Sequence, residues 1–139
     1  MAWPDAKARI KTILAGVSGV KRVYDNPPAG IEDRPCFVIY PPALEVQRLS
    51  GGWREKVYTV RMRLLLTDED IATATALIET YRELMIDAFD AHLRLFGDAG
   101  LIEGPRVDEA RSFPYGGDQY TGMDCFLTVR MDDEVTYGV

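Results

Sequence analysis

The side chains that could act as acids, bases or nucleophiles are few in this sequence. His92 is the only histidine, and it stands beside Leu93, Leu95 and Phe96 just after a predicted helix. A histidine metal cluster, or a Ser–His or Cys–His nucleophilic pair, would have to use this one residue as its base. A structural or surface histidine is the simpler interpretation, so the sequence favours a protein that is not an enzyme.

The two cysteines show no arrangement typical of redox or metal chemistry. Cys36 and Cys125 each lie in an apolar, strand-like stretch, and they form no Cys-x-x-Cys pair. Such residues are usually buried free thiols in a reducing compartment. We therefore expect no disulfide, and we expect the protein to reside in the cytoplasm.

Two acidic runs and two glycine pairs are the remaining candidates for a metal or cofactor site. Residues 68–70 and 132–134 carry the hard oxygen ligands that Mg²⁺ and Ca²⁺ prefer, but neither run has the spacing of a calcium loop. We interpret 68–70 as a helix start and 132–134 as a solvated strand end. The glycines in 50–52 and 115–117 lie in predicted turns and lack the pattern of a phosphate cradle. The sequence thus predicts no metal and no cofactor.

Apolar residues at helical spacing predict two amphipathic helices. The first covers about residues 4 to 16, with Pro4 suited to its first position. The second covers about residues 69 to 90 and follows Thr67-Asp68-Glu69-Asp70, a variant of the capping box with acids at the positive end of the helix dipole. Its apolar face runs from Ile71 to Phe89.

Apolar runs and alternating patterns predict the strands. Cys36 to Tyr40, bracketed by prolines, is typical of a central strand buried on both faces. Residues 44–66 alternate around Ser50-Gly51-Gly52 and predict a long β-hairpin with an outward basic face. Further strands are predicted at Val20 to Tyr24, Val107 to Phe113 and Met123 to Glu134, and a connector at Leu93 to Gly104.

The order of these elements predicts an α+β fold. We expect a mixed, mainly antiparallel sheet with a long β-hairpin and two amphipathic helices packed on one face. The length of 139 residues and the hydrophobic share of 47% suit one globular domain over residues 1–139.

Charge and hydropathy exclude several classes of partner. The net charge of −6 argues against a general nucleic-acid binder, because such affinity comes mainly from Lys and Arg. The first residues, Met1 to Asp5, lack the apolar segment of a signal peptide, and no stretch approaches the ~20 apolar residues of a membrane span. We expect neither a membrane nor a nucleic acid as partner.

The charges are unevenly distributed along the chain. Residues 44–66 hold five basic and two acidic side chains, a net +3, whereas residues 103–139 hold three basic and eight acidic ones, a net −5. One interpretation is a head-to-tail interface between copies of the chain, and the other is a set of solvated strand faces. The residues assigned to the interface are Arg48, Arg54, Lys56, Arg61 and Arg63 on the basic side and Asp132, Asp133 and Glu134 on the acidic side.

The whole-chain order of motifs also resembles a known family. The opening helix is followed by Val23-Tyr24-Asp25-Asn26-Pro27-Pro28, by the strand Pro35-Cys36-Phe37-Val38-Ile39-Tyr40-Pro41, and by a hairpin ending in Val60-Arg61-Met62-Arg63-Leu64. The second helix and a final strand pair complete the pattern. In this order the chain resembles the tail terminator, or tail completion, proteins of long-tailed bacteriophages.

The resemblance implies a structural protein of the virion tail or neck that is assembled in the host cytoplasm. Such a protein forms a hexameric ring that caps the tail tube, stops its polymerisation and joins it to the head. The tail tube protein and the head–tail connector proteins are the implied partners. No residue role is carried over, because the family has no short signature to align.

Three alternatives stay open. A head–tail connector or stopper protein of the same neck region shares the size and the class of function. A small ligand- or peptide-binding module would use the aromatic loop from Phe113 to Tyr120, which is otherwise a wide hairpin turn covering a sheet edge. A hydrolase-like enzyme would need His92 or paired carboxylates.

Overall fold

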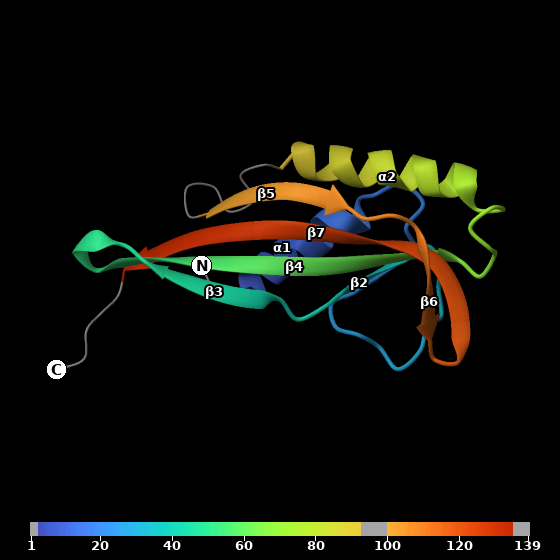
Figure 1. Ribbon diagram of the computed structural model, residues 1–139, viewed down its shortest axis with the longest axis horizontal. Helices are drawn as coiled ribbons and strands as arrows, with labels where there is room; N and C mark the ends of the chain where they lie inside the picture. Colours follow the sequence, from blue (N-terminus) through green and yellow to red (C-terminus); the bar gives the residue numbers. More distant parts are fainter. Residues whose placement is uncertain (1–2, 93–99, 135–139) are drawn as a thin grey trace.

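Two long strands form the middle of the sheet in the computed structural model, which describes residues 3–92 and 100–134 (Figure 1). These are β4 (Trp53–Thr67) and β7 (Asp118–Glu134), which pair antiparallel along almost their whole length. The strand order is β1-β2-β4-β7-β5, and β3 and β6 pair with β4 and β7 respectively. Only β1 and β2 run parallel among the described pairs, so the prediction of a mixed, mainly antiparallel α+β fold is confirmed.

The bounds of the remaining helices and strands are as follows. The helices are α1 (Trp3–Ala15) and α2 (Thr75–Asp90), and the strands are β1 (Arg22–Tyr24), β2 (Cys36–Ile39), β3 (Ala43–Arg48), β5 (Gly100–Val107) and β6 (Arg111–Tyr115). A short 3-10 turn, Ser50–Gly52, joins β3 to β4. Neither helix in the described part of the chain has the length and hydropathy needed to span a bilayer.

Alternation along β4 and β7 creates two different sheet faces, because successive side chains of a strand point to opposite sides. Both helices share one cluster of buried apolar side chains with the first face. Figure 1 shows α1 lying behind the sheet and α2 running along β5. The fully buried members of this cluster include Ile10, Leu14, Phe37, Val60, Met62, Leu64, Met85, Phe89, Met123 and Leu127.

The opposite face, called the outer face from here on, carries a second and smaller core at one end. There β7 continues beyond β4 and pairs with β6, which folds over the sheet (Figure 1). The buried side chains of this second core are Tyr24, Cys36, Val38, Leu65, Phe113 and Tyr120.

The start of the second helix differs from the sequence prediction. α2 begins at Thr75, one to two turns later than the predicted start at residue 69, and Ile71 is 43% exposed. The Asp70 carboxylate accepts a hydrogen bond from the Thr73 amide (2.8 Å), so it caps the turn at residues 71–74 that leads directly into the helix. The acidic run therefore belongs to a corner between β4 and α2 and is only indirectly a helix start.

The strands after α2 also differ from the prediction. Residues 100–107 form β5, although residues up to Gly104 were predicted to be a connector, and the chain leaves regular structure at Asp108 before β6 begins. The predicted strand from Val107 to Phe113 therefore spans two strands. Its interruption has a physical cause, because the chain must leave the main sheet to pair with the far end of β7.

The predicted central strand is internal but not central. β2 lies between β1 and β4, and its four residues are buried. The middle of the sheet belongs to β4 and β7, whose alternating patterns looked half-exposed in the sequence. Burial on both faces at β2 comes from the second core, which covers Cys36 and Val38.

Candidate functional site

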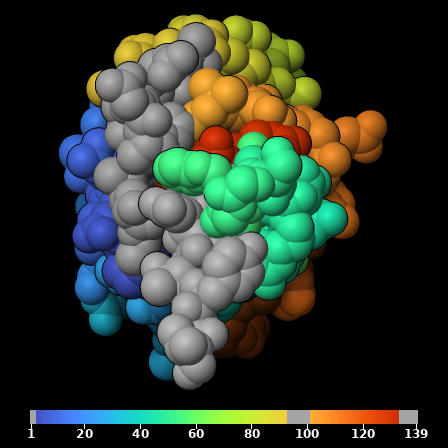
Figure 2. Space-filling view, turned by 90° about the vertical axis from the view of Figure 1, so that its left-hand side faces the viewer, coloured from blue at the N-terminus to red at the C-terminus, as the bar shows by residue number. Residues whose placement is uncertain are grey.

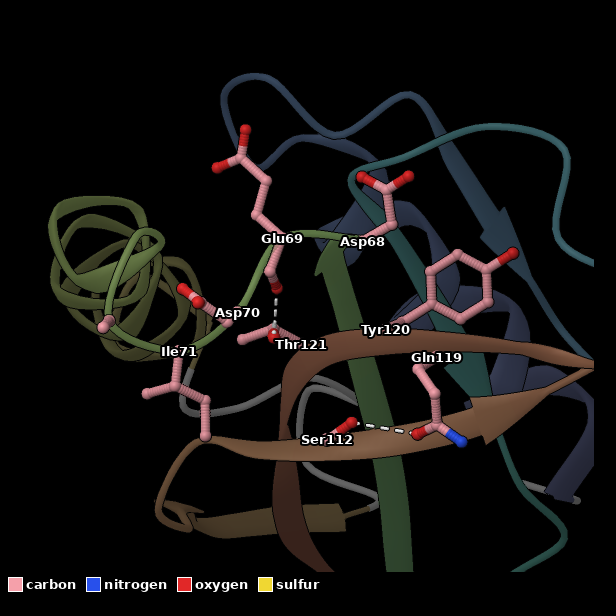
Figure 3. A pocket seen from close by; sticks show the side chains of 9 residues that line it. Asp68, Glu69, Asp70, Ile71, Ser112, Gln119, Tyr120 and Thr121 are labelled. Atoms are coloured by element: carbon pink, nitrogen blue, oxygen red, sulfur yellow. Dashed lines mark hydrogen bonds between the residues drawn. The ribbon is translucent and has the colours of Figure 1, made fainter.

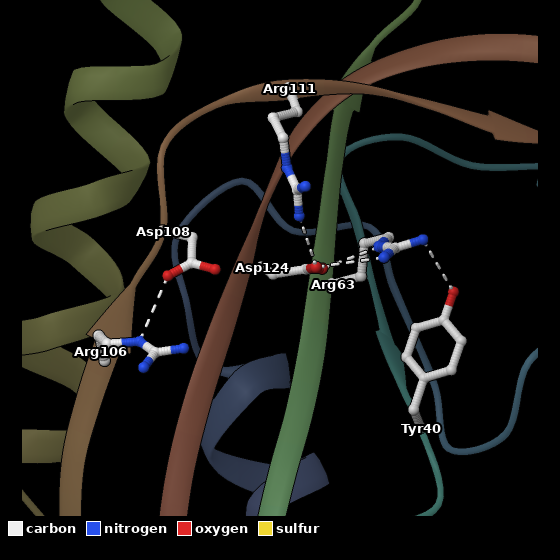
Figure 4. Close-up of polar contacts among 6 residues, drawn as sticks. All are labelled: Tyr40, Arg63, Arg106, Asp108, Arg111 and Asp124. Atoms are coloured by element: carbon white, nitrogen blue, oxygen red, sulfur yellow. Dashed lines mark hydrogen bonds and ion pairs between the residues drawn. The ribbon is translucent and has the colours of Figure 1, made fainter.

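The most buried charged group on the outer face is Asp124 on β7, which is 2% exposed. Its register partner on β4 is Arg63, whose Nε and Nη2 atoms donate to the two carboxylate oxygens at 2.8 and 3.1 Å. Arg111 adds a longer contact from Nη2 at 3.4 Å (Figure 4). This bidentate geometry is the strong form of an arginine–carboxylate interaction.

Aromatic rings enclose the arginine of this pair. The Arg63 guanidinium lies 4.0 Å from the centre of the Phe113 ring, and its Nη1 donates to the Tyr40 hydroxyl at 3.4 Å. Burial alone would lower the pKa of Arg63, but the hydrogen bonds and charge of Asp124 outweigh it and raise that pKa. Because the arginine stays charged and the carboxylate oxygens are bonded, the cluster fastens β6 to the sheet and leaves no group poised for acid–base work.

Of the predicted interface residues, Arg61 and Arg63 lie in the middle of the outer face. Arg63 belongs to the pair with Asp124, and the Arg61 guanidinium stacks 4.1 Å from the Tyr40 ring centre. Both are partly buried. Arg61 and Arg63 are thus both engaged within the chain.

The other three basic residues, Arg48, Arg54 and Lys56, lie on a projecting arm. We define the arm as residues 43–57, which comprise β3, the turn at Ser50–Gly52 and the beginning of β4. Figure 1 shows that it extends to one end of the longest axis.

The predicted acidic partner lies beside this arm in the same chain. In the register of β4 and β7, Asp132 is opposite Glu55, Asp133 is opposite Arg54 and Glu134 is opposite Trp53. The basic and acidic segments are therefore neighbours on adjacent strands of one subunit. The sequence could not reveal this, because it depends on which strands pair and in which register.

A pocket of about 480 Å³ lies at the opposite end of the molecule (Figure 3). The corner at 68–72 forms one wall, and β6 and the beginning of β7 form the other. The Thr121 hydroxyl donates to the Glu69 carbonyl at 2.6 Å and holds the two walls together. The lining residues are Asp68, Glu69, Asp70, Ile71, Ala72, Ser112, Gln119, Tyr120 and Thr121.

The rim of this pocket is acidic, and its interior is mainly apolar. Asp68, Glu69 and Asp70 are exposed, and hydrogen bonding from Thr73 lowers the pKa of Asp70. Asp68 forms an ion pair with Arg34 at 3.6 Å. The sequence had singled out these acids as a helix start, but it gave no signal for their partners on β6 and β7.

The other chemical candidates occupy separate places. His92 is exposed just after α2, and Cys36 and Cys125 are buried free thiols in the two different cores. Burial raises the pKa of Cys36 to about 11 and that of Cys125 to about 12. Within residues 3–92 and 100–134, no three His, Cys, Asp or Glu side chains are placed to hold a metal ion.

The aromatic loop is a tight turn rather than a wide one. Gly116 and Gly117 have φ of 57° and 89° and form the two-residue connection that such positive angles allow. Phe113 and Tyr120 are buried in the second core, and the Tyr115 hydroxyl donates to the Pro28 carbonyl. These aromatics therefore pack on the outer face, whereas the structural interpretation of this loop placed them over a sheet edge.

The structure thus defines an α+β protein whose distinctive surfaces are an exposed arm and an acidic pocket. No family model and no curated protein matches the chain. A chain in a solved structure described as the virion of a native gene transfer agent particle has a similar fold, with a TM-score of 0.51 and 18% sequence identity. The match covers 93% of this chain and 91% of that one, so the likeness extends over nearly the whole fold.

Proposed function

We propose that this chain is a structural protein of a phage or phage-like particle and acts as a tail terminator. In this role it forms a hexameric ring in the tail or neck, caps the tail tube, stops its polymerisation and joins it to the head. Its mechanism is surface complementarity between subunits, and its partners are the tail tube protein and the head–tail connector proteins.

The observation that carries this proposal is the fold likeness to a virion chain over 93% of this sequence. A match that covers 93% of this chain extends well beyond one common motif. The resemblance to tail terminators in the order of sequence elements supports the same class of function independently. The engagement of Asp124, Arg63 and Arg111 with one another supports a structural role for the most buried charges.

Removal of the gene from a producing strain, followed by electron microscopy of the particles, tests the role. A terminator is needed to stop tube growth, so we expect overlong tail tubes without attached heads. Tails of normal length that fail to attach to filled heads would instead indicate a connector or stopper protein of the neck. Normal infectious particles would contradict both roles.

The mass of the purified protein tests the ring. Light scattering over a range of concentrations is expected to show a species of about six subunits. Incubation with tail tubes is the second condition, because a ring can form on its template. A single-subunit mass under both conditions would contradict ring formation.

A further inference from the structure

The arm exposes an unusual amount of apolar surface for its size. Leu44, Val46, Leu49 and Trp53 are 52%, 40%, 46% and 48% exposed. Only three other large apolar side chains in the described ranges 3–92 and 100–134 are exposed, and Ile71 at the distant pocket is one of them. A concentration of this kind marks an interaction surface more often than a solvated one.

The arm also presents positive charge next to these apolar side chains. Arg48 is exposed and stands directly opposite Arg54 in the β3–β4 register. Carboxylates of a partner would complement an exposed arginine at this position. In Figure 2 the arm, coloured teal to green, points toward the viewer at its end of the molecule.

The pocket at the other end complements both properties. Its acidic rim of Asp68, Glu69 and Asp70 suits the arginine, and its apolar interior beside Ile71 suits a large apolar side chain. A volume of about 480 Å³ falls in the range of pockets that enclose a ligand group, which is roughly 300–1,000 Å³.

We propose that the arm of one copy of this chain docks into the acidic pocket of the next copy. Leu49 and Trp53 enter the apolar interior, and Arg48 faces the carboxylates of the rim. This inference rests on the proposed ring and names its interface. It also replaces the acidic partner expected at 132–134, since those residues lie beside the arm within the same chain.

The positions of the two surfaces fix the type of assembly. The arm and the segments that line the pocket, residues 68–72 and β6, lie at opposite ends of the longest axis, so one subunit cannot bring the two surfaces together by itself (Figure 1). An interface between two different surfaces is heterologous, and it produces a ring when successive rotations close.

Cross-linking between two proteins that each carry one engineered cysteine tests the contact directly. A mixture of Leu49→Cys and Ile71→Cys proteins, treated with a short bismaleimide, is expected to give a covalent dimer that neither protein gives alone. Cys36 and Cys125 are fully buried with raised pKa values, so the engineered thiols react preferentially. Replacement of Ile71→Cys by Leu77→Cys, an exposed apolar position on α2, is the matched control and should give no dimer.

Substitutions test the apolar and the charged parts of the arm–pocket contact separately. Trp53→Ser is expected to weaken self-association about tenfold or more, as for a buried aromatic anchor, whereas Leu77→Ser should leave it unchanged. Arg48→Glu and Glu69→Lys should each weaken association, and their combination in one chain should restore part of it. Circular dichroism of each variant verifies that the subunit is folded.

The outcomes separate this inference from the proposed ring. A hexamer that forms without the 49–71 cross-link, or that tolerates Trp53→Ser and Arg48→Glu, overturns the arm–pocket contact and leaves the ring standing. Cross-linked chains that stay open overturn the ring and support the contact. A single-subunit mass at all concentrations and on tail tubes overturns both the ring and the arm–pocket contact. If the arm binds the tube protein and not another copy of this chain, the contact between copies is also overturned.

Discussion

The guanidinium of Arg63 lies between the Phe113 ring and the carboxylate of Asp124, and its side chain is only 15% exposed. In the sequence this arginine alternates with apolar residues and looks like one charge of a solvated strand face. The structure shows that the strand neighbour β7 supplies its partner. A carboxylate between Met123 and Cys125, in an otherwise apolar run, was the signal that could have revealed the pair.

The substitution Asp124→Asn is expected to lower the free energy of unfolding by about 3 kcal/mol, because it leaves a largely buried guanidinium without its counter-charge. Urea denaturation followed by circular dichroism measures the change. Asp87→Asn on the exposed side of α2 is the matched control, with an expected change within about 0.5 kcal/mol. Equal effects of the two substitutions would show that the pair contributes nothing particular to stability.

At the scale of elements, β7 serves two pairings that meet at one glycine. Gly122 is the register partner of Leu65 on β4 and of Arg111 on β6. A Cβ at this position would collide with the Leu64 carbonyl oxygen and lie 3.2 Å from the Leu65 Cα. The close approach of the backbones lets β7 pass from the main sheet to the second core, so the glycine is required by packing.

Gly122→Ala is therefore expected to destabilise the fold by about 3 kcal/mol, the upper part of the usual range for overpacking. Gly30→Ala provides the control, because a Cβ at Gly30 has no heavy atom within 4 Å. The midpoint of thermal unfolding compares the two variants. If Gly122→Ala melted with the native chain, the tight β4–β7 approach would have no role in stability.

At the scale of the whole molecule, the buried central strands and the exposed arm are different parts of the sheet. Within residues 3–92 and 100–134, β4 and β7 are paired on both sides and contribute ten buried side chains to the first core, whereas β3 is paired only with β4 and all six of its residues are exposed. In the described part of the chain β3 is thus an edge strand, and proteins usually protect such edges or use them for binding.

The rates of amide hydrogen exchange should differ between the arm and the central strands β4 and β7. At a concentration where light scattering shows single subunits, we expect the amides of β3 to exchange well before those of β4 beyond Thr59 and of β7 from Met123 to Val129. Assembly should then slow exchange in both the arm and the corner at 68–72. Protection of β3 equal to that of β7 in the single subunit would contradict the expected weakness of the arm.

The sequence by itself determined the class of fold and the type of most elements. Helical spacing in residues 4–16 and alternation in residues 58–66 depend only on the periods of helix and strand, and burial of one face follows from them. The predicted start of α2 was wrong because Asp70 bonds to a local turn ahead of the helix. Strand β5 was missed because its glycines at 100 and 104 are typical of a connector.

Only the tertiary structure decided which charges meet. The pairing of β4 with β7 places Arg63 on Asp124, although more than sixty positions separate these two residues along the chain. The same pairing leaves the arm at one end and brings residues 68–72 to β6 and β7 at the other. Electrostatic contacts act over a few ångströms in space, so strand register, which a single sequence does not encode locally, determines them.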